Sequence, residues 1–282
     1  MNRLIQMFVA AACATTIAFS APMNLNTASP DSSVSFGLDA LSAALAVDTG
    51  SNRTSTAAIT DSSDPGILVL SLEEARAAGL PLPADLAAEA TEPEGFALLT
   101  GQGPGANQIR VIGGDEAGAM YGALELAEQI RQRGLEGVVD IARSPAMADR
   151  GVKFNCPLDV RTPSYTDACD AAQKNIAEMW NPDFWKPFID ELARARFNMI
   201  SLWNLHPFPS MVRVPEYPDV ALADVKRSTV DWKEIYSLSG RDYDDPSIVG
   251  QTETLLSMTV EEKIAFWRDI MAYARSRNVH FY

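Results

Sequence analysis

Two groups of polar and aromatic side chains in the second half of the chain have the residue types needed to bind a small ligand. Each group lies at the end of a predicted β-strand, the first over residues 152–155 and the second over residues 198–205. Guanidinium and ammonium groups donate hydrogen bonds to carboxylates and hydroxyls, and an indole offers an apolar face to a ring. The candidates are Lys153, Asn155, Asp159, Arg161, Trp203, Asn204 and His206.

The elements around these groups alternate between strand and helix. A helix is predicted over about 183–196, between the two strands, and a third strand is predicted at residues 279–282. Thr259 and Glu262 form a capping box that opens another helix before that third strand. This is the order in which a (β/α)₈ barrel begins, and such barrels place their ligand-binding groups at the carboxyl ends of the strands.

The predicted barrel is incomplete. Residues 149–282 carry three candidate strands, whereas a complete barrel has eight strands and about 250 residues. We therefore expect the remaining strands to lie beyond Tyr282. The expected fold class is α/β, with a small α/β domain followed by the first strands and helices of an incomplete barrel.

Residues 35–142 are expected to form the small α/β domain, and residues 143–282 the beginning of the barrel. Apolar runs and helical spacing predict the elements of the small domain. Ser71 and Glu74 form a capping box that opens one of its helices. The expected strands cover residues 67–70, 96–99 and 109–112, and the longer helices begin near residues 38 and 115.

A glycine-rich turn over residues 113–118 follows a predicted strand and opens a helix, as in dinucleotide-binding loops. Its spacing is not G-x-G-x-x-G, and no acidic residue ends a following strand. A tight turn with close packing is therefore the favoured explanation. A nucleotide-dependent oxidoreductase remains the weaker alternative, and no cofactor is expected.

The first residues have the pattern of a secretory signal. Arg3 precedes an uncharged, largely apolar run to residue 21, and Ala18 and Ser20 have the spacing of a cleavage site. We expect a signal peptide over residues 1–20, a flexible leader over residues 21–34, and a secreted or periplasmic protein without stable membrane insertion. Lipid anchoring at Cys13 is the less favoured alternative.

Composition narrows the possible partners. The chain has 23 basic and 37 acidic side chains, a net charge of −14, which argues against a nucleic-acid binder. Its two histidines and three cysteines form no metal-binding motif, so no metal site is expected. Pairing of Cys156 with Cys169 stays open, as does the oligomeric state.

Two stretches of the small domain resemble a known family. They are Glu-Gly-Phe-Ala-Leu at residues 94–98 and the run Ile-Gly-Gly-Asp-Glu-Ala-Gly-Ala-Met-Tyr-Gly-Ala-Leu at residues 112–124. These resemble the domain that precedes the catalytic barrel in β-N-acetylhexosaminidases, and a similar pattern occurs in α-glucuronidases. Phe96 replaces a more usual tyrosine. The resemblance implies that this domain supports the barrel and does not perform the chemistry.

The second half resembles the same hexosaminidases. Asp-Arg-Gly-Val at residues 149–152 is similar to their first barrel strand, and this similarity implies that Arg150 binds sugar; a salt bridge is the alternative. Residues 197–206 are similar to their K-x-N-x-x-H-W-H strand. His206 matches the last histidine of that motif, and Asn204 replaces the first. For Trp203 the alternative is packing within the barrel, and for His206 a structural hydrogen bond.

The resemblance implies a glycoside hydrolase acting on oligo- or polysaccharides that contain amino sugars or uronic acids. The family's catalytic Asp-Glu pair follows its fourth strand, so we expect the catalytic carboxylates beyond Tyr282. The chain's own loop carboxylates are usual turn formers, and none is assigned as catalytic. A non-catalytic carbohydrate-binding protein on the same fold is the alternative. The loop carboxylates are Asp159, Glu216, Asp219, Asp242, Asp244 and Asp245.

Overall fold

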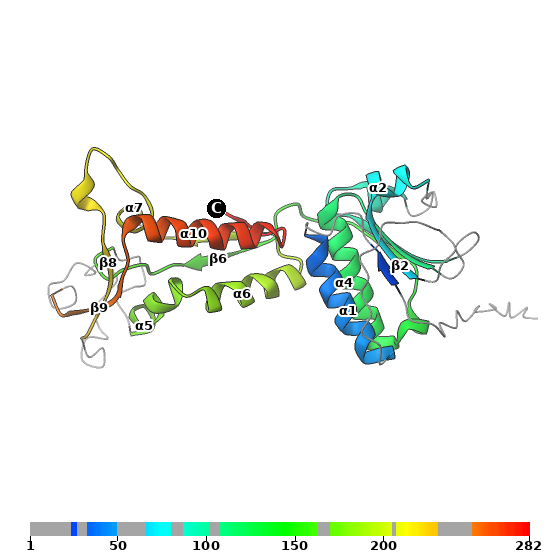
Figure 1. The fold of residues 1–282 in the computed structure, drawn as a ribbon, viewed down its shortest axis with the longest axis horizontal. Coiled ribbons are helices and arrows are strands. Elements are labelled where there is room, and N and C mark those ends of the chain that lie inside the picture. Colours follow the sequence, from blue (N-terminus) through cyan, green and yellow to red (C-terminus); the bar gives the residue numbers. More distant parts are fainter. Residues whose placement is uncertain are drawn as a thin grey trace, which may run out of the picture. The chain divides into compact units, whose positions relative to one another are not determined.

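The computed structural model divides the chain into two compact units, Met1–Ser144 and Pro145–Tyr282. The division lies two residues from the predicted boundary between residues 142 and 143. Each unit has its own sheet and its own helices (Figure 1). The structure describes residues 24–26, 33–49, 66–79, 87–101, 108–162, 170–204, 207–230 and 250–282.

The first unit is built on a five-stranded sheet with the order β1-β2-β4-β3-β5. Strands β1, β2 and β4 are parallel, whereas β3 pairs antiparallel with both β4 and β5. This mixed sheet carries the three strands that the apolar runs predicted. The strands are β1 (Asn24–Asn26), β2 (Gly66–Ser71), β3 (Phe96–Thr100), β4 (Gln108–Gly113) and β5 (Ile141–Arg143).

Strand β1 corrects one expectation. Residues 21–34 were expected to be a flexible leader, but Asn24–Asn26 form an edge strand that pairs with the start of β2. A strand at an edge is held by main-chain hydrogen bonds, so its polar side chains give no periodic signal. Strand β5 was also missed, and it is only three residues long.

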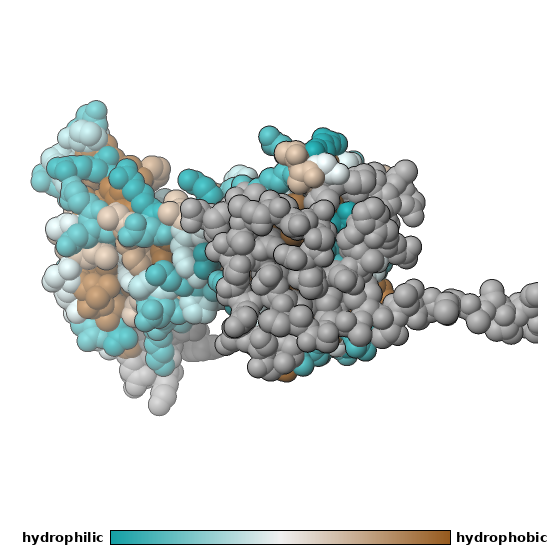
Figure 2. Space-filling model, turned by 45° about the vertical axis from the view of Figure 1, so that its right-hand side comes forward, coloured by the Kyte–Doolittle hydropathy of each residue, from teal (hydrophilic) through white to brown (hydrophobic). Residues whose placement is uncertain are grey.

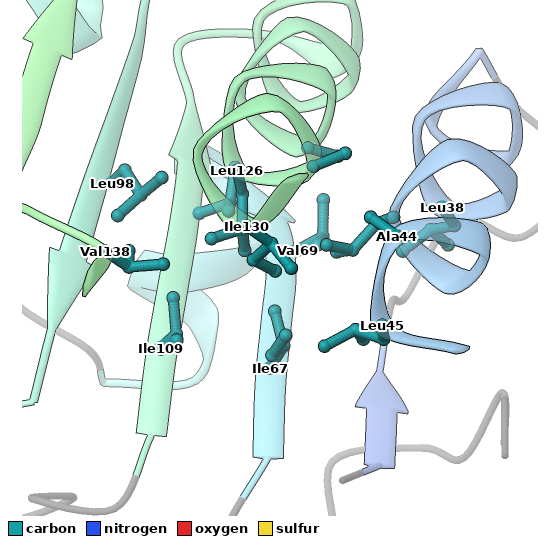
Figure 3. Packing of buried hydrophobic residues seen from close by; sticks show 14 of the residues in the cluster. Leu38, Ala44, Leu45, Ile67, Val69, Leu98, Ile109, Leu126, Ile130 and Val138 are labelled. Atoms are coloured by element: carbon teal, nitrogen blue, oxygen red, sulfur yellow. The ribbon is translucent and has the colours of Figure 1, made fainter. Parts of the chain in front are cut away.

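Helices cover both faces of this sheet. Alternate residues of β2 point to opposite faces, so Ile67 and Val69 pack in one core while Leu68 and Leu70 pack in the other. The first core, between the sheet and helices α1 and α4, is shown in Figure 3. The helices are α1 (Val34–Thr49), α2 (Leu72–Ala77), α3 (Ala87–Thr91), α4 (Glu116–Arg133) and the 3₁₀ turn η1 (Leu135–Gly137).

The glycine-rich turn before α4 serves packing. A Cβ on Gly113 would lie 2.0 Å from the Ala119 nitrogen, and one on Gly118 would lie 2.0 Å from the Gly95 oxygen. Asp115 caps the helix by accepting from the Gly118 N–H at 2.7 Å, and it also accepts from the Glu94 N–H at 3.0 Å. A carboxylate therefore already occupies the helix end where a phosphate would bind.

The second unit contains a parallel sheet of three strands in the order β10-β7-β6. Helices lie between these strands in the sequence, as connections between neighbouring parallel strands require. The predicted capping box at Thr259 is confirmed, because its hydroxyl accepts from the Glu262 N–H at 3.3 Å. The elements are β6 (Gly151–Asn155), α5 (Asp170–Met179), α6 (Pro182–Arg194), β7 (Met199–Trp203), α10 (Val260–Arg275) and β10 (His280–Phe281).

The stretch between β7 and α10 contains two antiparallel strands, β8 and β9, which pair with each other and are called the hairpin below. Its strands are rich in charged residues and threonine, so hydrophobic periodicity does not reveal them. Helix α5 was missed as well. The additional elements are α7 (Phe208–Met211), the 3₁₀ turn η2 (Pro218–Val220), β8 (Asp224–Ser228) and β9 (Thr252–Ser257).

In the view of Figure 2, the surface of the described residues is mainly hydrophilic and carries smaller hydrophobic patches. Within the described ranges, none of the helices combines the length and the apolar character that crossing a lipid bilayer would demand. The predicted signal peptide, its cleavage site and Cys13 lie outside the described residues.

Candidate functional site

Among the described residues, the helices of the second unit pack against one face of its three-stranded sheet. Ile200 is fully buried, and Phe281 beside it contacts Trp185 of α6 and Trp267 of α10 at ring distances of 5.9 and 6.3 Å. Residues paired in a parallel sheet share a face, so Val152, Ile200 and Phe281 all face the helices.

The opposite face therefore carries the neighbouring residues of each strand. Apart from Gly151 and Met199, its residues have polar or aromatic side chains, and Lys153, Asn155 and His280 are exposed. In a closed barrel this face would be the interior, and its upper edge would hold the ligand. The residues on this face are Gly151, Lys153, Asn155, Met199, Ser201, Trp203 and His280.

Two of the predicted binding residues meet on this face. The Lys153 ammonium lies 4.2 Å from the centroid of the Trp203 ring, so a cation from the middle of β6 stacks on an aromatic face at the carboxyl end of β7. Asn204 follows directly, and its side-chain amide donates to the Cys156 carbonyl oxygen at 2.7 Å. This bond ties together the two chain segments that leave β6 and β7.

The loop after β6 carries a second cluster. The Asp159 side chain is fully buried, and its two oxygens accept from Arg161 Nε and Nη2, both at 2.8 Å. Arg161 Nη2 also donates to Asp224 Oδ1 of β8 at 2.6 Å. Arg161 is thus held by two carboxylates, and its side chain keeps 29% exposure.

The hairpin lies at the end of the unit toward which β6 points (Figure 1). The Val160 N–H donates to the Lys226 carbonyl oxygen at 3.0 Å, and the Lys226 N–H donates to Asp159 Oδ2 at 2.8 Å. These bonds attach β8 to the loop after β6. The hairpin is therefore part of the carboxyl-end region where the candidate residues lie.

The charges of this cluster shift two pKa values in the expected directions. The hydrogen bond with Asp159 raises the pKa of the Arg161 guanidinium, although burial opposes the rise. For Asp224, burial favours a higher pKa, but the hydrogen bond and charge of Arg161 outweigh it and lower the pKa. Both groups are thus held in their charged forms across the neutral range.

Arg150 lies at the other end of the strand. Its guanidinium donates to the carbonyl oxygens of Met147, Ala148 and Arg196 at 2.7, 3.1 and 2.8 Å. These bonds hold the chain before β6 against the end of α6, and they separate Arg150 from Trp203 and Lys153. His206, the remaining sequence candidate, lies outside the described residues.

Sequence reasoning missed the residues that the hairpin and α10 bring to this cluster, namely Asp224, Lys226 and Lys263. Asp224 and Lys226 lie in a polar segment without periodicity. Lys263 did leave a signal, because it lies on the helical stripe formed by Val260, Trp267 and Ile270, all of which are buried. A lysine at such a position must be buried with partners.

Acid–base and metal chemistry find little support among the described residues. Glu216 and Asp219 are exposed, and Asp159 has both oxygens bonded to Arg161. Within the described ranges, no group of three or more histidine, cysteine or acidic residues is placed to hold a metal ion. Asp242, Asp244, Asp245 and Cys169 lie outside those ranges, and Cys156 is buried.

Solved structures similar to the chain include glycoside hydrolases of families GH138, GH115, GH20 and GH84. A GH138 enzyme targeting pectin rhamnogalacturonan II matches with a TM-score of 0.56 and 17% identity, over 92% of this chain and 24% of that one. A GH115 4-O-methyl-α-glucuronidase matches with a TM-score of 0.44 and 18% identity, over 64% of this chain and 25% of that one.

A Streptomyces plicatus β-hexosaminidase variant matches with a TM-score of 0.46 and 17% identity, over 92% of this chain and 40% of that one. No protein-family model and no curated protein sequence matches the chain. The match with the GH138 enzyme shows a shared fold. The chain spans about a quarter of the length of that enzyme.

Proposed function

We propose that the chain is part of a secreted glycoside hydrolase, with the second unit as the first strands of a (β/α)₈ barrel. The observation that carries this proposal is the fold shared with a GH138 enzyme over 92% of the chain. The parallel order β10-β7-β6, with the described helices on one face, is the arrangement that a barrel wall has. The first unit is then the support domain.

The proposed binding residues are Lys153 on β6, Arg161 in the loop after β6, and Trp203 at the carboxyl end of β7. Trp203 offers a flat apolar surface to a pyranose ring, and the two cations donate to hydroxyls or a carboxylate. Asn204 holds the ends of β6 and β7 together through the Cys156 carbonyl. His206 joins this set on sequence grounds alone. The contacts of Arg150 give it a structural role, so we leave it out of the proposed site.

The substrate class is an oligo- or polysaccharide containing amino sugars or uronic acids. Lys153 and Arg161 suit the carboxylate of a uronic acid, and Trp203 suits the ring of either sugar. Salt dependence distinguishes the two sugars. Binding of a uronic acid carboxylate to Lys153 would weaken as the salt concentration rises, whereas binding of a neutral amino sugar would not change with salt.

A non-catalytic carbohydrate-binding protein on the same fold is the second candidate. Its supporting observation is Asp159, the first carboxylate after β6 in the sequence, which is buried with both oxygens bonded to Arg161. Such a carboxylate cannot serve as a freely accessible acid or base. Both candidates share the binding site and differ in whether hydrolysis occurs.

Calorimetric titration of the whole chain with N-acetylglucosamine and galacturonic acid oligomers tests the proposal. Binding is expected for one of the two classes, with a loss of at least tenfold in Trp203→Ala and a smaller loss in Lys153→Met. Lys186→Met, which removes an exposed lysine of α6, is the matched control and is expected to bind normally. No heat with either class would contradict the proposal.

Hydrolysis assays on the bound oligomer separate the two candidates. Product release by this chain would favour the hydrolase and would show that the catalytic carboxylates lie within it. Binding without product release, by this chain and by any longer form of the protein, would favour the carbohydrate-binding alternative.

A further inference from the structure

Lys263 is fully buried, and it is the sole lysine of which this is true within the described part of the chain. It lies in the second turn of α10, on the stripe that packs against the rest of the second unit. Moving an ammonium group out of water costs several kcal/mol unless partners replace the water. The groups that contact this side chain therefore indicate which part of the structure its charge stabilises.

The partners of Lys263 are main-chain oxygens at the start of the hairpin. Its Nζ donates to the Leu222 oxygen at 2.9 Å and to the Asp224 oxygen at 2.7 Å. The Trp180 ring lies 5.5 Å from the same nitrogen. Within the described residues no carboxylate forms an ion pair with Lys263. The ammonium instead binds two carbonyl oxygens of the main chain that leads into β8.

Asp224 connects this lysine to the proposed binding site. Its carbonyl oxygen accepts from Lys263 and, at 3.3 Å, from Arg161 Nη2, while its carboxylate accepts from Arg161 Nη2 at 2.6 Å. Fixing the main chain at Asp224 therefore fixes one of the two carboxylates that hold the Arg161 guanidinium. Arg161 Nη1 is left as the donor without a bond within the described residues.

A direct chemical role for Lys263 does not fit these contacts. A nucleophilic or acid–base lysine must reach substrate, but this side chain has no exposed surface and spends its hydrogen bonds on two carbonyl groups. We propose that Lys263 is a positioning residue, which fixes the main chain at Leu222 and Asp224 and through Asp224 sets the orientation of the Arg161 guanidinium.

This inference deepens the proposed function, because it rests on Arg161 as a binding group. Its test uses the whole chain and no saccharide, so it can fail while saccharide binding holds, and the reverse. The readout is the hydrogen-exchange rate of the Arg161 Nε–H, measured by nuclear magnetic resonance on ¹⁵N-arginine-labelled protein. The signal is assigned by its loss in Arg161→Lys.

Lys263→Met keeps the length and apolar body of the side chain and removes the ammonium. We expect Arg161 Nε–H exchange to rise at least tenfold, while the amide protection of α10 and β7 is retained. Arg268→Met removes an exposed cation from the same helix and is expected to leave exchange unchanged. Unchanged exchange in a folded Lys263→Met protein, or an equal rise in Arg268→Met, would overturn the proposal.

If Lys263→Met does not fold, Asp224→Asn tests whether Asp224 holds the Arg161 guanidinium in position. This variant keeps the carbonyl oxygen that Lys263 binds and weakens only the carboxylate that holds Arg161. We expect Arg161 Nε–H exchange to rise at least threefold with the amide protection of β8 retained. Exchange at the wild-type rate would show that Asp224 does not transmit position to Arg161, and the proposal would then be wrong.

Discussion

At the residue scale, the Asp159 side chain accepts four hydrogen bonds near the candidate site. Its oxygens accept from the Arg161 N–H, Arg161 Nε, Arg161 Nη2 and the Lys226 N–H, at 2.8 to 2.9 Å. A buried carboxylate that satisfies this many donors becomes costly to remove, because each donor is then left without water or partner.

We expect Asp159→Ala to lower the free energy of unfolding of the second unit by about 3–5 kcal/mol, the usual cost of breaking a buried ion pair. Urea denaturation followed by tryptophan fluorescence measures it. Asp219→Ala, at an exposed carboxylate of the same unit, is the control and should change stability by less than about 0.5 kcal/mol. Equal losses of unfolding free energy in the two variants would show that the buried hydrogen bonds of Asp159 do not stabilise the second unit.

Lys263 makes stability depend on pH with a definite sign. Burial lowers the pKa of its ammonium in the folded protein, and the charge of Asp159 only partly offsets this. Between that lowered pKa and the ordinary lysine pKa of about 10.4, the unfolded chain binds more protons than the folded one, so stability must rise with pH. The difference in unfolding free energy between wild type and Lys263→Met should therefore grow in favour of wild type across this range. A difference independent of pH would contradict the assignment.

At the scale of elements, close backbone contacts place α4 on its sheet. The Cβ that alanine would add at Gly118 lies 2.0 Å from the Gly95 oxygen, which belongs to rigid main chain. At Gly79 an added Cβ meets nothing within 4 Å, although its φ of +69° disfavours alanine. The two glycines thus separate the cost of lost space from the cost of backbone conformation.

We expect Gly118→Ala to destabilise the first unit by about 3 kcal/mol, as overpacking against main chain does. Gly79→Ala should cost about 1 kcal/mol, because only the left-handed conformation is penalised. Thermal unfolding followed by far-ultraviolet circular dichroism compares them. A larger loss at Gly79 than at Gly118 would refute the packing explanation for the glycine-rich turn.

At the scale of the whole molecule, the two units bury their sheets differently. The sheet of the first unit is covered by helices on both faces, whereas the described part of the second sheet is covered on one. The larger the fraction of apolar surface buried, the more stable the unit. The second unit should therefore unfold first.

All five tryptophans belong to the second unit, which makes this order measurable in the intact chain. In a urea titration we expect the tryptophan fluorescence transition to come at a lower concentration than the final loss of circular dichroism. Digestion by a protease at intermediate urea should leave a product that ends near Pro145. Coincident transitions by both probes would mean that the units unfold together.

The sequence by itself determined the elements that depend on neighbouring residues. The capping boxes at Ser71 and Thr259 bond residues three positions apart, and the apolar runs of β2, β4 and β7 follow directly from side-chain type. Local patterns of this kind are visible without a fold. The same strand assignments give Trp203 its position at the carboxyl end of β7, whereas Lys153 is the middle residue of β6.

Only the tertiary structure decided which distant residues meet. Lys226 joins Asp159 across 67 positions, Lys263 joins Asp224 across 39, and Arg150 turns away to three carbonyl groups at the far strand end. No spacing rule reports such contacts, because they depend on where the polar hairpin β8–β9 folds back. Strand β1 was not predicted either, because it pairs with β2 through main-chain hydrogen bonds, which do not depend on side-chain type.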